Sequence, residues 1–188
     1  MTPGPGHNGG PTMEPGASWR RTAWTKAREA LLPSLPLEVV RLRVKRAERL
    51  GIDYRTYATI RATSGHDIVA FLFSGNALEL RRGATELPDA VAARLERTDA
   101  ARLAAVYRPA DPAALVAGAG GRIDAATQAP AFTDSWAAMR DRLDAALADW
   151  RAARAGTVLV AATAVERDWC AAARLAGTIP AERFFVSG

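Results

Sequence analysis

The chain has 188 residues and a formal net charge of +5, and apolar side chains make up 49% of it. This length can bury the core of one compact domain, or of a small helical module joined to a modest α/β domain. Two histidines and a single cysteine argue against a disulfide framework and a Cys/His zinc site. The longest wholly apolar run, at 68–73, is far shorter than the roughly 20 residues that a membrane-spanning helix needs.

Residues 1–17 are rich in glycine and proline and hold little that could be buried, so we expect a disordered leader. The stretch GHNGGP at 6–11 resembles leaders of bacterial proteins, a resemblance that implies no function. Helical patterns follow over 18–32, 36–50 and 53–64, and together they make residues 18–64 a basic helical segment. We expect Asp53 to cap the start of the third helix and Gly65 to end it.

Positive charge is concentrated in the first third of the chain. Residues 1–63 hold eleven Lys and Arg against five Asp and Glu, whereas residues 64–188 hold fourteen against fifteen. Such an asymmetry favours an anionic partner for the basic part, and nucleic acid is the commonest one. A solvated, arginine-rich helical face accounts for the same charge.

The stretch RVKRAERLGIDYRTYATIRA, residues 43–62, has a small residue (Ala47) ahead of a turn glycine (Gly51), with apolar residues on both sides. This spacing resembles a helix-turn-helix motif. The resemblance implies that the second helix enters the DNA major groove, with Arg55 positioned for a bidentate contact to guanine. The implied groove-facing residues are Tyr54, Arg55, Thr56, Thr59 and Arg61, and the implied phosphate contacts are Arg41, Arg43, Lys45, Arg46 and Arg49. Arg46 stands where many such motifs have an uncharged packing residue, and helical hairpins with a turn glycine also occur in proteins that never touch DNA.

Residues 65–188 have the pattern of an α/β domain. Continuous apolar runs, typical of strands buried on both faces, lie at 67–77, 101–109 and 156–164, and a shorter final strand is expected at 183–188. Helical patterns alternate with them at 87–98, 135–156 and 163–177, and Thr163 and Glu166 have the spacing of a capping box at the start of the last one. This alternation predicts an α/β fold with a layered, mostly parallel sheet of about three or four strands.

A second candidate site lies where the predicted strands end, because parallel α/β sheets bind ligands beyond the carboxyl ends of their strands. The candidate residues there are Ser74, Gly75, Asn76, Arg108, Asp111, Thr163, Glu166 and Arg167. Backbone N–H groups with these side chains could hold a phosphate or another anion. Ser, Gly and Asn at such positions also commonly make turns and caps.

Other short patterns carry no chemistry. Ser64, His66 and Asp67 are neighbours at a turn and cannot adopt the geometry of a catalytic triad. The glycines at 118–121 lack the spacing of a phosphate loop, and the chain has no HExxH, GxSxG, paired CxxC or EF-hand pattern. No catalytic residue, cofactor or metal site is therefore assigned.

Three functional hypotheses follow. The first is a nucleic-acid-binding protein with a regulatory or accessory role, in which the α/β part supplies self-association or ligand sensing. The second is a small-molecule binder or enzyme with its site around 74–76, and the third is a protein-interaction module without activity. The lone cysteine and the lack of a signal peptide lead us to expect a cytoplasmic protein that does not enter a membrane.

Overall fold

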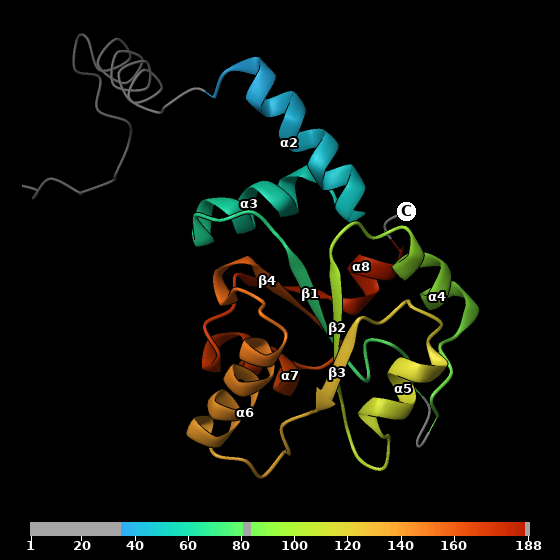
Figure 1. Cartoon of the computed structure of the whole chain (residues 1–188). Helices are drawn as coiled ribbons and strands as arrows, with labels where there is room; N and C mark the ends of the chain where they lie inside the picture. Colours follow the sequence, from blue (N-terminus) through green and yellow to red (C-terminus); the bar gives the residue numbers. More distant parts are fainter. Residues whose placement is uncertain (1–34, 81–83, 187–188) are drawn as a thin grey trace, which may run out of the picture. The chain divides into compact units, whose positions relative to one another are not determined.

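The computed structural model describes residues 35–80 and 84–186 (Figure 1). The predicted leader and the predicted helix over 18–32 lie outside the described residues. Residues 41–188 form one compact unit, separate from residues 1–40. The strands, and the helices from α3 onward, all lie within this unit.

A five-stranded, wholly parallel sheet is the centre of the unit, which confirms the predicted α/β fold. Its strands are β1 (Ala70–Ser74), β2 (Ala101–Val106), β3 (Ala125–Gln128), β4 (Thr157–Ala161) and β5 (Gly177–Pro180), in the order β3-β2-β1-β4-β5. The prediction of three or four strands falls short of the observed five because it misses both β3 and β5, which are four-residue edge strands and are only partly buried. Runs this short and this weakly apolar give little periodic signal.

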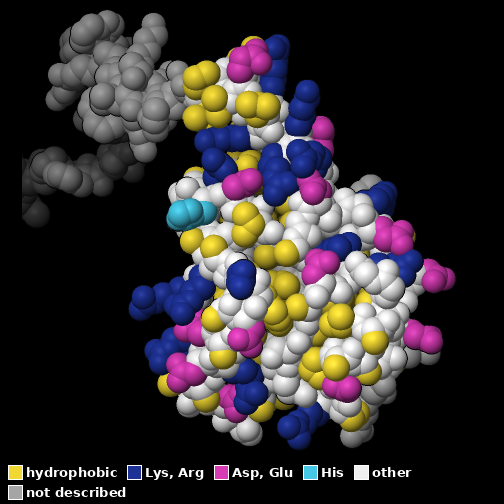
Figure 2. Space-filling view, in the orientation of Figure 1, with side chains coloured by type: hydrophobic (Ala, Val, Ile, Leu, Met, Phe, Trp, Pro, Cys, Tyr) yellow, Lys and Arg dark blue, Asp and Glu magenta, His cyan; other side chains and the backbone are white. Residues whose placement is uncertain are grey.

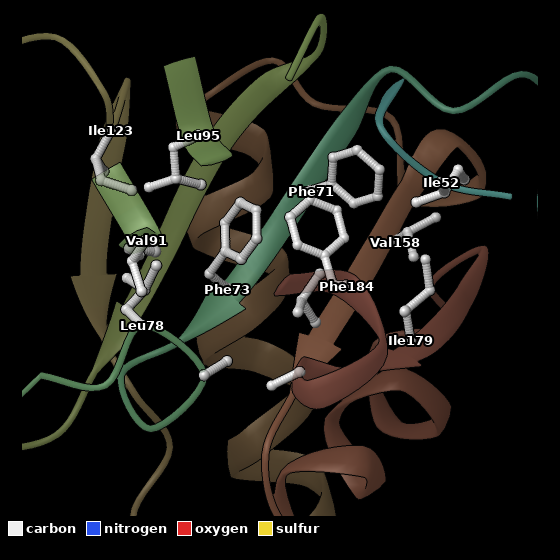
Figure 3. Packing of buried hydrophobic residues seen from close by; sticks show 14 of the residues in the cluster. Ile52, Phe71, Phe73, Leu78, Val91, Leu95, Ile123, Val158, Ile179 and Phe184 are labelled. Carbon is white, nitrogen blue, oxygen red and sulfur yellow. The ribbon is translucent and has the colours of Figure 1, made fainter. Parts of the chain in front are cut away.

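The predicted final strand at 183–188 is wrong over its described residues, since 183–186 belong to helix α8 (Ala181–Val186). The sheet's last strand, β5, ends immediately before that helix, at Pro180. Phe184 of α8 packs on the sheet instead, with its ring centroid 5.0 Å from that of Phe71 and 5.2 Å from that of Phe73 (Figure 3). A short aromatic run can thus be buried by one turn of helix as well as by a strand.

Helices cover both faces of the sheet. The face with Phe71 and Phe73 packs against α4 (Asp89–Glu96), α5 (Pro112–Gly118) and α8. The face with Ala70 and Leu72 packs against α6 (Trp136–Asp149) and α7 (Ala164–Ala172). A single-turn 3-10 helix, η1 (Arg154–Gly156), leads into β4. Among the helices of the described ranges, none is both long and apolar enough to cross a bilayer.

The basic helices α2 (Leu37–Leu50) and α3 (Tyr54–Ser64) share the core of the α/β unit from Arg41 onward. Their buried apolar residues belong to the same cluster as the sheet: Ala47, Leu50, Ile52, Tyr57 and Ile60. The turn between them needs Gly51, whose φ of +73° is left-handed and whose Cα faces the guanidinium of Arg94. As predicted, Asp53 caps the start of α3 and Gly65 ends it.

Candidate ligand pocket and basic helical surface

The strand order reverses between β1 and β4, and doubly wound sheets commonly bind ligands at that point. Here the crevice is bridged by the side chains of Asn76 and Glu166. The Nδ2 of Asn76 donates to Oε1 of Glu166 at 2.8 Å, and the backbone N–H groups of Ala162 and Thr163 each donate to Oε2 at 2.9 Å. Glu166 is fully buried, so these three donors stabilise its carboxylate and join the ends of the two strands.

The neighbouring predicted ligand residues also have structural partners. The buried Ser74 hydroxyl accepts from the backbone N–H of Ala77 at 3.1 Å, which shapes the turn after β1. Gly75 packs against β2, since an added Cβ there would lie 3.4 Å from Cα of Val106, close to ordinary van der Waals contact. Thr163 forms the predicted capping box of α7 with Glu166.

The remaining residues of that prediction are more widely spread. Asp111 is the N-cap of α5 and accepts from the backbone N–H groups of Ala113 and Ala114. Arg167 is exposed on α7. The structure therefore brings Asn76, Thr163 and Glu166 together at the switch point. Asp111 and Arg167 lie outside that cluster, and Arg108 lies in a separate pocket.

An open pocket of about 280 Å³ lies at the carboxyl ends of β2 and β3. Its walls include Tyr107, Arg108, Gln128, Phe132 and Arg142. Only Arg108 was among the predicted ligand residues. Tyr107 directly follows the apolar run of β2, and that position could have marked it as a candidate. Phe132 and Arg142 come from the β3–α6 loop and from α6, and only the tertiary fold brings them here.

The pocket has an aromatic wall. The rings of Tyr107 and Phe132 are stacked, with their centroids 5.1 Å apart and their planes 11° from parallel. Phe132 is nonetheless 70% exposed. A tight turn presents it: the carboxylate of Asp134 accepts from the backbone N–H of Ala131 at 2.9 Å, and the N–H of Asp134 donates to the carbonyl of Ala131 at 3.0 Å. Phe132 is therefore a largely exposed ring held in a defined position.

Two guanidinium groups flank this wall. Arg108 is exposed, and no described residue pairs with its side chain. Arg142 lies 3.6 Å from Asp134, measured from Nε to Oδ2. The Nε2 of Gln128 donates to the carbonyl of Val106, which fixes the amide beside the pocket. Two cations against one carboxylate give the pocket a net positive charge next to an aromatic surface.

The hydroxyl of Tyr107 is buried and has no hydrogen-bond partner among the described residues. Burial, reinforced by the charge of Glu166, raises the pKa of Tyr107 far above its ordinary value. The phenol is therefore neutral at physiological pH. A buried donor without an acceptor is uncommon in folded proteins.

At the amino ends of β1 and β2, ion pairs hold the basic helices to the sheet. The Nε of Arg46 lies 3.2 Å from Oδ2 of Asp67, and its Nη1 lies 3.2 Å from Oδ2 of Asp99. Its Nη2 donates to the carbonyl of Ile68 at 2.8 Å. Arg49 pairs with the same Asp99. These two arginines of the predicted phosphate-binding set thus have carboxylate partners within the protein.

Asp67 also receives two groups from α3. The hydroxyl of Tyr57 donates to its Oδ1 at 2.8 Å, and Nη1 of Arg61 lies 3.5 Å from the same oxygen. Burial opposes ionisation of Asp67, but the hydrogen bond from Tyr57 and the charge of Arg46 outweigh it, and the pKa of Asp67 is lowered. Asp67 is therefore an ionised anchor for both basic helices.

Several basic residues of the two helices are exposed to solvent, whether or not they are paired. Figure 2 shows Lys and Arg side chains gathered over α2, where Arg41, Lys45 and Arg49 are exposed and Arg43 is half-buried. On α3, Arg55 is exposed. No described side chain forms a hydrogen bond or ion pair with Lys45, Arg43 or Arg55. These three are therefore the cations best placed to bind an anion from solution.

The remaining predicted groove-facing residues of α3 have local roles. Tyr54 is half-buried against the core. The hydroxyl of Thr56 donates to Asp53 at 2.6 Å, and that of Thr59 donates to the carbonyl of Arg55 at 2.8 Å. Two of these residues, together with Arg55, face a hollow that reaches across to β5 and α8.

That hollow has a volume of about 400 Å³ and is lined by Arg55, Thr56, Thr59, Ile60, Thr178 and Arg183. Nothing in the sequence pattern linked α3 with Thr178 and Arg183, which lie more than a hundred residues later. Among residues 35–80 and 84–186, no three His, Cys, Asp or Glu side chains converge as metal ligands would. Comparison with protein-family models, curated proteins and solved structures finds no match for this chain.

Proposed function

We propose that the protein binds a small planar anion in the pocket formed by Tyr107, Arg108, Gln128, Phe132 and Arg142. The observation that carries this proposal is the largely exposed Phe132 ring, held parallel to Tyr107 beside the unpaired guanidinium of Arg108. An exposed aromatic face and a free cation are the two surfaces that such a ligand requires.

The physical chemistry favours this ligand class over others. Stacking on a positioned aromatic ring contributes about 0.5–1.5 kcal/mol beyond the burial of area. An arginine fork matches the two oxygens of a carboxylate or phosphate, and it is the geometry that distinguishes such groups from a neutral ligand. Ligand pockets for drug-sized molecules typically begin near about 300 Å³, so the ligand here is small. The lining residues supply no paired acid and base, and we therefore propose binding and assign no reaction.

A calorimetric titration of the full chain tests the proposal. The probes are salicylate and adenosine 5′-monophosphate, with benzamide and adenosine as their neutral counterparts. We expect saturable binding of at least one anion, weakened about tenfold by Phe132→Ala or Arg108→Ala, since about 1.4 kcal/mol corresponds to a factor of ten. Arg167→Ala, which removes an exposed arginine of α7, is the matched control. Binding that is equal for the anions and the neutral probes, or that survives both pocket substitutions, would contradict the proposal.

Nucleic-acid binding by α2 and α3 is the second candidate function. The observation that favours it is the exposure of Lys45 and Arg55, with Arg43 beside them. Carboxylates hold three other arginines of the same helices: Arg46, Arg49 and Arg61. Phosphate contacts of this kind act without regard to base sequence and weaken as salt rises.

Fluorescence anisotropy of a labelled duplex at two salt concentrations tests this second function. We expect salt-sensitive binding that the double substitution Lys45→Ala/Arg55→Ala reduces. The control is Arg97→Ala/Arg167→Ala, which removes two exposed arginines elsewhere and the same net charge. Equal loss of affinity in the two variants would mean that only overall charge matters, and no binding at low salt would exclude the function.

A further inference from the structure

The hollow between α3, β5 and α8 brings cations together from distant parts of the chain. Arg55 lies in the first turn of α3, and Arg183 lies on α8, which directly follows β5. Three threonines and one isoleucine complete its lining, so most of its side chains are polar. Its volume of about 400 Å³ is larger than a lone tetrahedral anion needs, and this leaves room for the group to which such an anion is attached.

One of the two arginines is fixed and the other is free. Nη2 of Arg183 lies 3.0 Å from Oδ2 of Asp53. Asp53 also accepts from the backbone N–H of Thr56 at 2.9 Å and from its hydroxyl at 2.6 Å. The hydrogen bonds from Thr56, with the charge of Arg183, lower the pKa of Asp53 and keep it ionised. Asp53 thus orients Arg183 through one contact, which leaves most of the guanidinium N–H groups available.

The guanidinium of Arg55 has no hydrogen bond or ion pair with any described residue. Its charge and that of Arg183 exceed the single negative charge of Asp53. The hydroxyl of Thr59 already donates to a carbonyl, so the two guanidinium groups are the principal donors that the hollow offers. A tetrahedral anion can accept from two guanidinium groups at once, and phosphate is the common biological anion that arginine pairs bind.

The shape of the site also matters. Residues of α3 that would read base edges in a helix-turn-helix share the hollow with Thr178 and Arg183. A recognition helix must enter a major groove about 12 Å wide and present its outer face there. The face of α3 that carries Arg55 and Thr59 is instead one wall of a concave site, which suits a phosphate group better than a base edge.

We propose that the α3–β5–α8 hollow binds a phosphate group through Arg55 and Arg183. The phosphate is either the backbone diester of a nucleic-acid strand or a free phosphate ester, and the binding chemistry is the same. This inference goes beyond the proposed planar-anion pocket, with which the hollow shares no residue. If the phosphate belongs to a nucleic-acid strand, the hollow is the place on α3 where the nucleic-acid binding of the second candidate function would occur.

The experiment uses the full chain and two probes, inorganic phosphate and a labelled duplex. Phosphate binding is followed by calorimetry at low salt, and duplex binding by anisotropy with and without added phosphate. We expect Arg55→Ala to weaken phosphate binding about tenfold and Arg97→Ala to leave it unchanged. Because Arg55 has no partner to lose, its substitution should not alter the unfolding midpoint. Arg183→Ala provides a second variant, and Asp53→Asn tests whether the orientation of Arg183 matters.

The outcomes separate the sources of the phosphate. Duplex binding that phosphate displaces and Arg55→Ala weakens identifies the nucleic-acid backbone. Phosphate binding without duplex binding identifies a free ester, and it would remove the second candidate function while leaving this site intact. The inference is overturned if phosphate does not bind at low salt, or if it binds Arg55→Ala and Arg183→Ala as tightly as the unaltered chain. Phe132→Ala should affect neither measurement, so failure of the planar-anion pocket would remain distinguishable.

Discussion

We call the two ends of the parallel strands the carboxyl edge and the amino edge of the sheet. Charged side chains are partnered differently at each. At the carboxyl ends, the one fully buried carboxylate of the described chain, Glu166, is satisfied by an amide and two backbone N–H groups. No arginine pairs with it there, and Arg108 is left free in the pocket nearby. At the amino ends of β1 and β2, Asp67 and Asp99 hold the arginines of α2 and α3 in ion pairs.

Part of the positive charge in the first third of the chain is therefore neutralised within the protein. Of the seven Lys and Arg in residues 41–61, three are paired with carboxylates of the α/β part: Arg46, Arg49 and Arg61. Their charge attaches the basic helices to the sheet. An excess of positive charge in a sequence therefore overstates the charge available to a partner, and the free cations need to be identified one at a time.

The largest expected effect is the loss of Glu166. Glu166→Ala would leave the amide of Asn76 and two backbone N–H groups without an acceptor, in a cavity the side chain once filled. We expect the free energy of unfolding to fall by about 3 kcal/mol, since each unsatisfied buried group costs roughly 1–3 kcal/mol. Urea unfolding measures it, with Arg167→Ala as a nearby exposed control. A change below that of the control would mean that the switch point is not held by this carboxylate.

At the opposite edge, Arg46→Ala should destabilise the protein by about 2 kcal/mol, because it removes charge-assisted hydrogen bonds to Asp67 and Asp99 in a partly buried position. Its neighbour Lys45 is exposed and unpaired, so Lys45→Ala should change stability by less than about 0.5 kcal/mol. Duplex anisotropy completes the comparison, since the second candidate function predicts that Lys45→Ala weakens binding. If both substitutions shift the urea midpoint equally, the division into anchoring and free cations is wrong.

Much of this architecture could be predicted from sequence, and the limits have physical causes. The apolar runs of β1, β2 and β4, the caps Asp53 and Gly65, and the capping box of Thr163 follow local rules, and the structure confirms them. The short edge strands and α8 were missed because their burial depends on partners in other segments. Asp99 lies 53 residues beyond Arg46, and no local pattern joins them.

The candidate sites show the same limit. Sequence reasoning placed a ligand site at the carboxyl ends of the strands, and the pocket there does include Arg108. It centred the site on residues 74–76, where the side chain of Asn76 instead pairs with that of Glu166. Phe132 lies in a loop after the weakly predicted β3, so its stacking on Tyr107 requires knowledge of the sheet order. Residues that close a strand end and residues that line a pocket look alike until their partners are known.

Phe132→Ala should have a smaller effect on stability, and it tests the open pocket at the carboxyl edge separately from the buried Glu166. Because the ring is 70% exposed, its removal should change the free energy of unfolding by less than about 1 kcal/mol. Affinity for a planar anion should fall about tenfold through the lost stacking. Calorimetry and urea unfolding on the same samples separate the two quantities. A loss of stability comparable to that of Glu166→Ala would show that the ring supports the fold, and the pocket proposal would lose its main support.

The smallest expected effect is the loss of stability at low pH that the protonation of Asp67 causes at the amino edge. The pKa of Asp67 is lowered in the folded state from an ordinary value of 3.8, so folding favours its ionised form. Its stabilisation is fully present above that ordinary value and is lost as the pH falls through the lower pKa of the folded state. Below about pH 4, unfolding midpoints should therefore fall more steeply with decreasing pH for the unaltered chain than for Asp67→Asn, which has no proton to gain. Asp53, whose pKa is also lowered, is present in both proteins and cancels in the difference. Parallel pH profiles for the two would mean that the ion pairs of Asp67 with Arg46 and Arg61 add no stability, and the contrast between the two edges would then rest on Asp99 and on packing.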